Sequence, residues 1–205
     1  NEYSKIITSI PKQPQALYYS GTLPEKRQAS VAIVGTRKPS SYGREVATNF
    51  ARSLANNGVI VVSGLALGID AIAHKAALDA GGTTIAVLGN GLHRIYPRTN
   101  RFPGERILNE GGAIISEYEE GVEPRPHHFL QRNRIVSGLS DAIIIIEAAK
   151  RSGTLNTAMY ALEQGRDVFV VPGNITSPLS EGCNALLKQG ASPITHINDI
   201  LETIR

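Results

Sequence analysis

The sequence contains a single cysteine, Cys183, and no tryptophan in 205 residues. One thiol excludes an internal disulfide and favours a reducing compartment, so we expect a cytoplasmic protein. No Cys/His ligand set and no H-E-x-x-H motif is present, so neither a metal nor another cofactor is expected. No apolar run approaches the ~20 residues of a membrane span, and the first residues lack the basic-then-apolar order of a signal peptide. The sequence therefore favours a soluble, intracellular protein.

Acidic residues are absent from Pro124 to Ser140, a stretch that contains Arg125, Arg132 and Arg134. The whole chain has a net charge of only +3 and a pI near 9.1, which permits an anionic partner but suits many other proteins too. The local distribution of charge is therefore more informative than the total.

Apolar, β-rich runs alternate along the chain with segments of helical spacing such as 42–56 and 69–79. This alternation predicts an α/β, Rossmann-like fold, in which helices cover both faces of an open, mostly parallel sheet. With 41% hydrophobic residues, the chain can bury one sizeable core. We expect residues 31–205 to form this domain and residues 1–30 to be an extension packed on it. The expected strands are 31–34, 59–62, 84–88, 113–115, 142–146 and 168–171.

The segments that follow these strands are rich in glycine and in basic residues. Open parallel sheets bind ligands beyond the carboxyl ends of their strands, glycine lets the backbone approach a ligand, and helix N-termini offer free N–H groups to anions. We therefore expect a phosphate-binding rim at this edge of the sheet, with aromatic candidates Tyr96, Phe102, Tyr118 and Phe129. The basic residues expected on the rim are Arg37, Lys38, Arg94, Arg98, Arg101, Arg132, Arg134, Lys150 and Arg151.

Three features point away from other chemistries. The first turn, Gly35-Thr36-Arg37-Lys38, is not G-x-G-x-x-G, which disfavours a dinucleotide cofactor. Asp70 and His74 share a helix face, but a first-turn carboxylate complements the helix dipole, so we expect a structural Asp70 with a partly buried His74 as its partner. Cys183 lacks a positioned base and is expected to be a small buried residue.

The motifs together resemble the DNA-processing protein A family (DprA, also called Smf). The resemblance rests on "VAIVGTR", "SGLALGIDAIAHKAAL", "IAVLGNGLHRIYPRTN", "ISEYEEGVEPRPHHFLQRNRIVSGLSDAIIIIEA", "SGTLNTAMYALEQGRDVFVVPGN" and "GCNALLKQGA", in that order. It implies an extended Rossmann domain that binds single-stranded DNA without being an enzyme. It also implies that the protein protects incoming strands in natural transformation and helps to load the RecA recombinase as a homodimer.

The candidate DNA pocket follows from the resemblance and from the glycine turns at the same edge. It comprises Gly35, Thr36, Arg37, Lys38, Gly64, Phe129, Arg132, Asn133, Arg134, Lys150, Arg151, Ser152, Gly153 and Thr154. Phe129 is expected either to stack on a base or to anchor its loop in the core.

Two alternatives stay open. Rossmann-like phosphoribohydrolases of nucleoside monophosphates carry P-G-G-x-G-T-x-x-E on an equivalent turn, but here Thr157 stands where the catalytic glutamate would be. Glu147 is near in sequence, although a strand-end acid can simply cap or orient the rim. A nucleotide sensor would also need a phosphate-binding rim, because such a rim alone does not distinguish a polymer from a small ligand.

The C-terminal segment supplies more apolar residues than we expect one flank of the sheet to hide, which favours a dimer interface. If these residues are instead all in the core, the segment gives no support for a dimer. The residues are Ala185, Leu186, Leu187, Ile197, Ile200 and Leu201.

Overall fold

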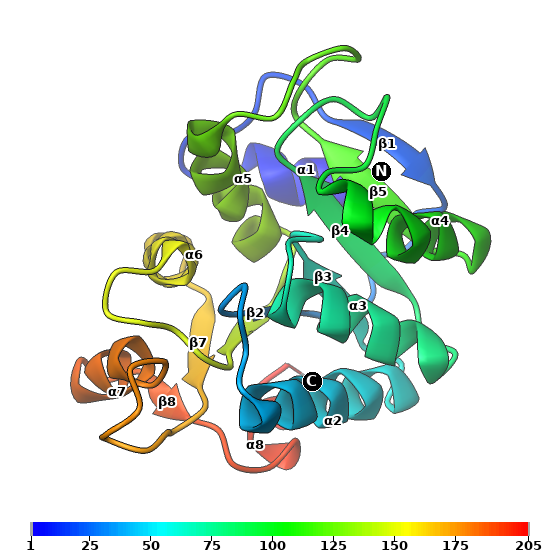
Figure 1. Ribbon diagram of the computed structural model, residues 1–205. Helices are drawn as coiled ribbons and strands as arrows, with labels where there is room; N and C mark the ends of the chain where they lie inside the picture. Colours follow the sequence, from blue (N-terminus) through cyan, green and yellow to red (C-terminus); the bar gives the residue numbers. More distant parts are fainter. Residues whose placement is uncertain (1, 205) are drawn as a thin grey trace.

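A single mixed sheet forms the centre of the molecule. The computed structural model describes residues 2–204, and within them eight strands follow the order β1-β5-β4-β3-β2-β6-β7-β8 (Figure 1). All neighbouring strands are parallel except β1 and β5. The expected α/β, Rossmann-like fold is confirmed. The strands are β1 Tyr18–Gly21, β2 Ser30–Val34, β3 Ile60–Ser63, β4 Thr84–Leu88, β5 Ala113–Ser116, β6 Ala142–Ile145, β7 Asp167–Val170 and β8 Ser192–Pro193.

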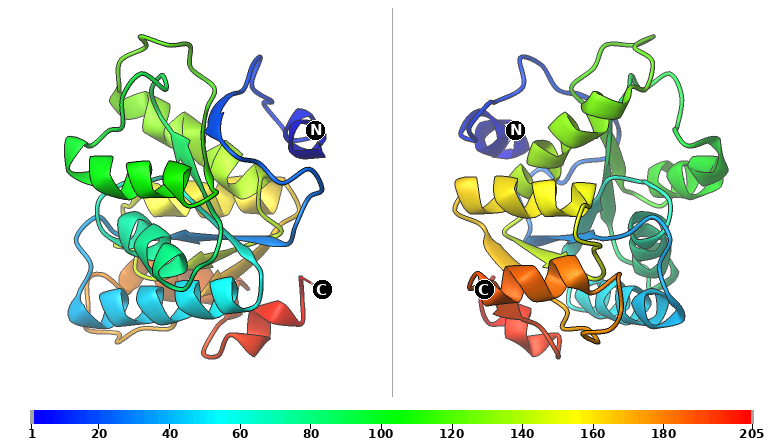
Figure 2. Two further views of the ribbon diagram at one scale, coloured as in Figure 1. Left: turned by 90° about the vertical axis from the view of Figure 1, so that its right-hand side faces the viewer. Right: turned by 60° about the vertical axis from the view of Figure 1, so that its left-hand side comes forward.

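Helices cover both faces of this sheet (Figure 2). Successive strand residues point to opposite faces, so Ala32 and Val34 pack beneath α1, α5, α6 and α7, whereas Val31 and Ile33 pack beneath α2, α3 and α8. Burial on both sides explains why these strands are continuous apolar runs. The helices are α1 Glu2–Thr8, α2 Ser41–Asn56, α3 Ile69–Asp79, the 3₁₀ turn η1 Arg98–Asn100, α4 Arg101–Asn109, α5 Pro126–Gly138, α6 Gly153–Glu163, α7 Glu181–Lys188 and α8 Asn198–Leu201.

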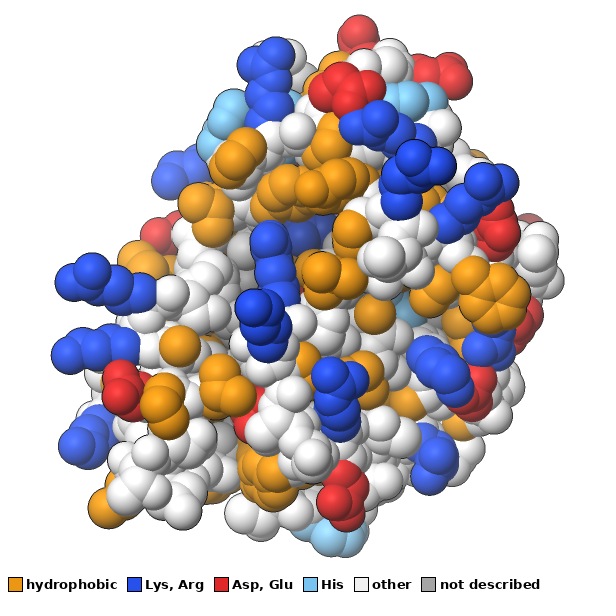
Figure 3. Space-filling model, in the orientation of Figure 1, with side chains coloured by type: hydrophobic (Ala, Val, Ile, Leu, Met, Phe, Trp, Pro, Cys, Tyr) orange, Lys and Arg blue, Asp and Glu red, His pale blue; other side chains and the backbone are white. Residues whose placement is uncertain are grey.

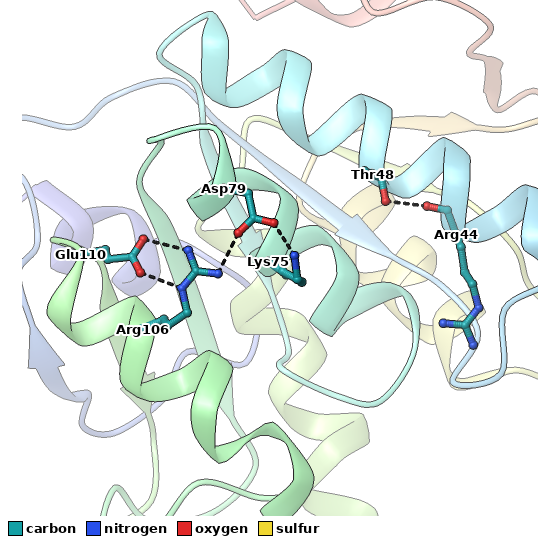
Figure 4. A network of polar contacts seen from close by, with 6 residues as sticks. All are labelled: Arg44, Thr48, Lys75, Asp79, Arg106 and Glu110. Carbon is teal, nitrogen blue, oxygen red and sulfur yellow. Dashed lines mark hydrogen bonds and ion pairs between the residues drawn. The ribbon is translucent and has the colours of Figure 1, made fainter.

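Polar contacts fix α4 against α3. Arg106 of α4 donates through Nη1 to Asp79 of α3 at 2.8 Å and through Nε to Glu110 at 2.6 Å (Figure 4). Asp79 also pairs with Lys75 of its own helix, and the hydrogen bonds from Lys75 and Arg106 lower the pKa of the Asp79 carboxyl. On α2, an ordinary side-chain-to-backbone bond joins Thr48 to the carbonyl of Arg44 (Figure 4).

The first 30 residues contain two elements that the sequence pattern did not indicate. Strand β1 pairs with β5 in antiparallel register, from Tyr18 opposite Ser116 to Gly21 opposite Ala113. Helix α1 buries Tyr3 and Ile7 in the same cluster as α5. The sheet thus extends by two edge strands beyond the expected set, with the antiparallel β1 at one edge and the two-residue parallel strand β8 at the other.

Most apolar residues of the C-terminal segment pack in or against the core of the domain. Leu186, Ile200 and Leu201 are buried, and Leu187 and Ile197 pack partly against the core. The expectation of a surplus apolar surface is therefore wrong for five of the six residues, because Ile197, Ile200 and Leu201 join the core cluster that contains Phe169 of β7. Ala185 is exposed. Cys183 is buried as expected, and burial raises the pKa of its thiol to about 11. Within residues 2–204, every helix is too short or too polar to cross a membrane.

Candidate nucleic-acid interface

The candidate site lies where the order of the strands reverses. The chain leaves β2 toward β3 on one side, whereas β6 lies on the other side of β2. In open parallel sheets such a switch point opens a crevice at the carboxyl ends of the strands. A cavity of about 460 Å³, here called the central pocket, occupies that crevice. Figure 3 shows a hollow near the middle of this face, with basic side chains at its lower edge.

Four segments line the central pocket: the turn after β2, the segment from the turn after β3 into α3, the first half of α5, and the turn into α6. A smaller cavity lies beside it and shares four lining residues with it: Arg37, Ala66, Phe129 and Arg132. The rest of its wall is formed by Gly64, Leu67, Tyr96 and Pro97. Among the predicted site residues, those that line the central pocket are Gly35, Thr36, Arg37, Phe129, Arg132, Asn133, Arg151, Ser152, Gly153 and Thr154. Lys38 and Lys150 are exposed next to these residues but line neither cavity.

Arg37 is the basic residue best placed to meet a ligand. Its side chain has no hydrogen bond or ion pair with any residue between 2 and 204, and its guanidinium lies 5.8 Å from the centre of the Phe129 ring. Tyr96 stacks on the same ring, with 5.7 Å between ring centres and 26° between ring planes. Phe129 packs against Gly89, where a Cβ atom would come within 2.8 Å of the ring. The ring therefore anchors its loop and also belongs to the pocket wall.

The N-terminus of α6 supplies backbone donors to the same pocket. Ser152 caps this helix by accepting a hydrogen bond from the Thr154 amide at 3.1 Å. A Cβ atom on Gly153 would meet only the side chain of Leu130, at 3.5 Å, so the backbone is open there. An exposed helix N-terminus favours anions through its free N–H groups and its dipole, and the exposed Arg151 adds a positive charge beside it.

Arg132 lies at the floor of the pocket, and its expected place on an exposed rim is wrong. It is 4% exposed and donates to the carbonyls of Gly64, at 2.7 Å, and Val87. Gly64 is needed there, because a Cβ atom would come within 2.5 Å of the guanidinium. Burial lowers the pKa of Arg132 to about 10, so it keeps its charge at neutral pH. Arg132 thus joins the ends of β3 and β4 and gives the floor a positive field.

Arg134 lies outside the pocket, and its expected place on the rim is also wrong. It forms two parallel bonds of 2.7 Å with the Glu117 carboxylate and donates to the carbonyl of Lys12 at 2.6 Å. Only 7% of the residue is exposed. The reason is helical geometry: residues two apart on a helix point about 200° apart, so Arg132 and Arg134 face different walls.

Asp70 and His74 do not pair with each other. The Asp70 carboxylate accepts from the amides of Gly64, at 3.1 Å, and Ala66, and so holds the turn after β3. Burial raises its pKa, and the nearby Arg132 charge opposes that rise. His74 is fully buried and bonds Thr84 at 2.6 Å through Nδ1. Burial, together with the charge of Arg132, lowers the pKa of His74 to about 3.

Neither the Asp70 nor the Glu147 carboxylate is exposed as a general base would be. Among the described residues that line the central pocket, Asp70 is the one acid, and its oxygen is bonded to backbone amides. Glu147 is 4% exposed and accepts from the Ser40 amide at 3.0 Å, which fixes the start of α2. Sequence reasoning missed Pro126 and Leu130 as pocket residues; their position in the segment after β5 was the available signal.

The fold and the pocket define a Rossmann-like protein whose crevice is lined by arginines, a helix N-terminus and an aromatic wall. Comparison with known proteins narrows this class. The chain belongs to the DNA recombination-mediator protein A family, whose model matches residues 1–205. It is 48% identical to the protein Smf of Escherichia coli, covering 99% of this chain and 54% of that protein.

Two solved structures are closely similar. The DNA processing protein A of Streptococcus pneumoniae has a TM-score of 0.90 at 40% identity, over 98% of this chain and 70% of the other. The DNA processing protein A of Helicobacter pylori, whose structure is described as showing a single-stranded DNA binding mode, has a TM-score of 0.87 at 36% identity over 97% and 91%. The chain thus spans about half the length of the Escherichia coli relative.

Proposed function

We propose that this chain binds single-stranded DNA in the central pocket. Phosphates contact Arg37, Arg151 and the amides at the start of α6, while a base lies against Phe129 and Tyr96. Lys38 and Lys150 add charge beside the pocket, and Gly35, Thr36 and Gly64 let the strand approach the backbone. Arg132 and Asn133 shape the pocket from α5. Arg134 supports it indirectly through Glu117.

One observation carries the proposal: the arginines at the mouth of the pocket have no acidic partner. Arg37 and Arg151 form no ion pair with residues 2–204, whereas the buried Arg134 does. Unpaired cations at a helix N-terminus favour phosphates. A stacking wall favours bases without selecting a sequence. The single-stranded DNA binding described for the Helicobacter pylori relative supports the same assignment.

The wider role is proposed from the family. Within the whole protein, the bound strand is protected and delivered to a RecA recombinase in natural transformation, with the protein acting as a homodimer in the cytoplasm. The family's description as a recombination mediator supports this role. A dimer would place two pockets on one particle, which raises the avidity for one strand without new contacts.

The test is a titration with oligonucleotides of increasing length, single-stranded and duplex, monitored by fluorescence anisotropy. We expect single strands to bind better than duplexes, and Arg37→Ala to weaken binding while the melting temperature stays unchanged. Arg52→Ala, which removes an exposed charge from α2, is the matched control. Saturation at one or two nucleotides would instead indicate a nucleotide sensor. Release of free base from nucleoside monophosphates, abolished by Glu147→Gln, would indicate a phosphoribohydrolase.

A further inference from the structure

A second cavity, of about 530 Å³, lies beside α4 and is here called the α4 cavity. Its floor is apolar and is formed by Leu88, Leu92, Ile95, Leu108 and Ile114. Its rim is basic and is formed by Arg94, Arg98 and Arg101, with Glu105 as an acidic neighbour. An apolar floor under a cationic rim suits a ligand that has both a flat apolar part and a negative charge.

The charge on this rim is largely available. Arg98 has no ion pair or side-chain hydrogen bond with residues 2–204. Arg101 pairs with Glu105 through Nε at 2.7 Å, but its side chain is 76% exposed. Arg94 pairs with Glu123, and both side chains are about half exposed. Exposed pairs of this kind contribute little stability, so a phosphate can recruit these arginines at small cost.

The α4 cavity and the central pocket are separated by one short loop. Tyr96 and Pro97 line the small cavity next to the central pocket, whereas Ile95 and Arg98 line the α4 cavity. The four consecutive residues 95–98 therefore line both the small cavity and the α4 cavity. Figure 3 shows further basic side chains toward the α4 side of the same face. A strand that leaves the central pocket across Tyr96 reaches the α4 cavity next.

The wall of the α4 cavity is preformed. The Asn100 side chain donates to the carbonyls of Leu65, at 2.9 Å, and Ala66, at 3.0 Å. Asn90 holds the other end of the loop by donating to the Arg94 carbonyl at 2.9 Å. Helix α4 itself is fixed to α3 through Arg106 (Figure 4). The binding of a ligand therefore does not carry the entropic cost of ordering this loop.

We propose that the α4 cavity is a second nucleotide subsite for the same strand. Arg98 and Arg101 bind a phosphate, and the base covers the apolar floor. The inference rests on the proposed function. The central pocket, at about 460 Å³, has room for about one nucleotide, so a longer strand needs such a continuation.

The experiment compares the wild type, the double variant R98A/R101A, Arg37→Ala and the control Arg52→Ala on a series of thymidine oligonucleotides. In the wild type, affinity should rise with length past the one or two nucleotides that the central pocket holds. The double variant should match the wild type on the shortest oligonucleotides and bind long ones about tenfold more weakly. Its log–log salt slope should become shallower by about 0.7 for each phosphate that is no longer neutralised. Thermal melts of all four proteins should agree, because the substituted arginines are exposed.

The outcomes separate the two proposals. If R98A/R101A binds every length like the wild type while Arg37→Ala does not, the subsite is refuted and the central pocket stands. If R98A/R101A weakens the binding of oligonucleotides of every length equally, Arg98 and Arg101 act only through the overall positive potential of the protein. The subsite is then also refuted. If the wild type binds no oligonucleotide, both proposals fail. Binding of thymidine monophosphate that survives Arg37→Ala and disappears in R98A/R101A, without any gain in affinity with length, would show an independent small-ligand site instead.

Discussion

Replacing Arg134 by alanine tests whether this arginine belongs to the fold rather than to the DNA-binding surface. The Arg134 and Glu117 side chains are 9% and 14% exposed and share two bonds of 2.7 Å. Alanine would leave the Glu117 carboxylate poorly solvated without its cation, and the carbonyls of Lys12 and Gln131 would each lose a donor.

The expected cost follows from this geometry. Removing one partner of a buried pair typically destabilises a protein by about 3–5 kcal/mol. Because a small part of this pair reaches solvent, we expect about 2–4 kcal/mol for Arg134→Ala. In a domain of this size, 1 kcal/mol lowers the melting temperature by roughly 2–4 °C, so the shift should be roughly 5–15 °C. Arg37→Ala removes an unpaired surface residue and should cost less than about 0.5 kcal/mol.

Urea unfolding followed by circular dichroism measures both variants, and a double-mutant cycle with Glu117→Gln isolates the pair. The cycle should show a coupling energy above about 1 kcal/mol, because neither residue has an equivalent partner elsewhere among residues 2–204. Equal stability of Arg134→Ala and the wild type, combined with weaker DNA binding, would refute the structural role. It would return Arg134 to the DNA-binding surface.

Three further outcomes are expected. The pKa of His74 is about 3 in the folded protein and ~6.5 when unfolded, so the unfolded state binds more protons between these values. Stability should therefore fall by about 2 kcal/mol from pH 8 to pH 5 in urea titrations, and His74→Gln should flatten this fall. Single-strand affinity should decrease with salt, with a log–log slope near −3 to −4 for about four to six phosphate contacts; a slope near zero would contradict an electrostatic interface. Gly64→Ala should lower both the stability of the fold and the affinity for single-stranded DNA, because its Cβ would collide with the Arg132 guanidinium. Wild-type stability and affinity would show that Arg132, at the floor of the central pocket, can shift.

The six strands β2 to β7 were predictable because they are apolar runs, mostly buried on both faces, whereas β8 has only two exposed residues and was not predicted. The N-terminal elements were not. Three of the four residues of β1 are exposed, so no alternation marks it, and its order comes from pairing with β5. Helix α1 has seven residues, too few to be stable alone. It forms because Tyr3 and Ile7 find a hydrophobic cluster contributed by residues more than a hundred positions away.

The position of the central pocket was predictable from strand ends and glycine turns, but the contacts of each arginine were not. Whether a cation is free depends on groups that are distant in the chain: the Glu117 carboxylate for Arg134, and the Gly64 and Val87 carbonyls for Arg132. The rotation of about 100° per helical residue separates the directions of Arg132 and Arg134 once α5 is known to be a helix. It could not have shown that both would be buried.

The Arg-Asn-Arg triplet of α5, residues 132–134, explains why basic residues lie close in sequence to the buried strand β6. Arg132 reaches the ends of β3 and β4, Asn133 donates to the Gly153 carbonyl at 3.3 Å at the start of α6, and Arg134 reaches Glu117 after β5. Because consecutive helical residues point about 100° apart, these three neighbours contact three different segments, and the one bonded by Arg134 lies outside the central pocket. The hydrogen bonds of the triplet are thus made within the protein. The positive charge left unpaired at the central pocket comes from Arg37 and Arg151, which the fold leaves without acidic partners among residues 2–204.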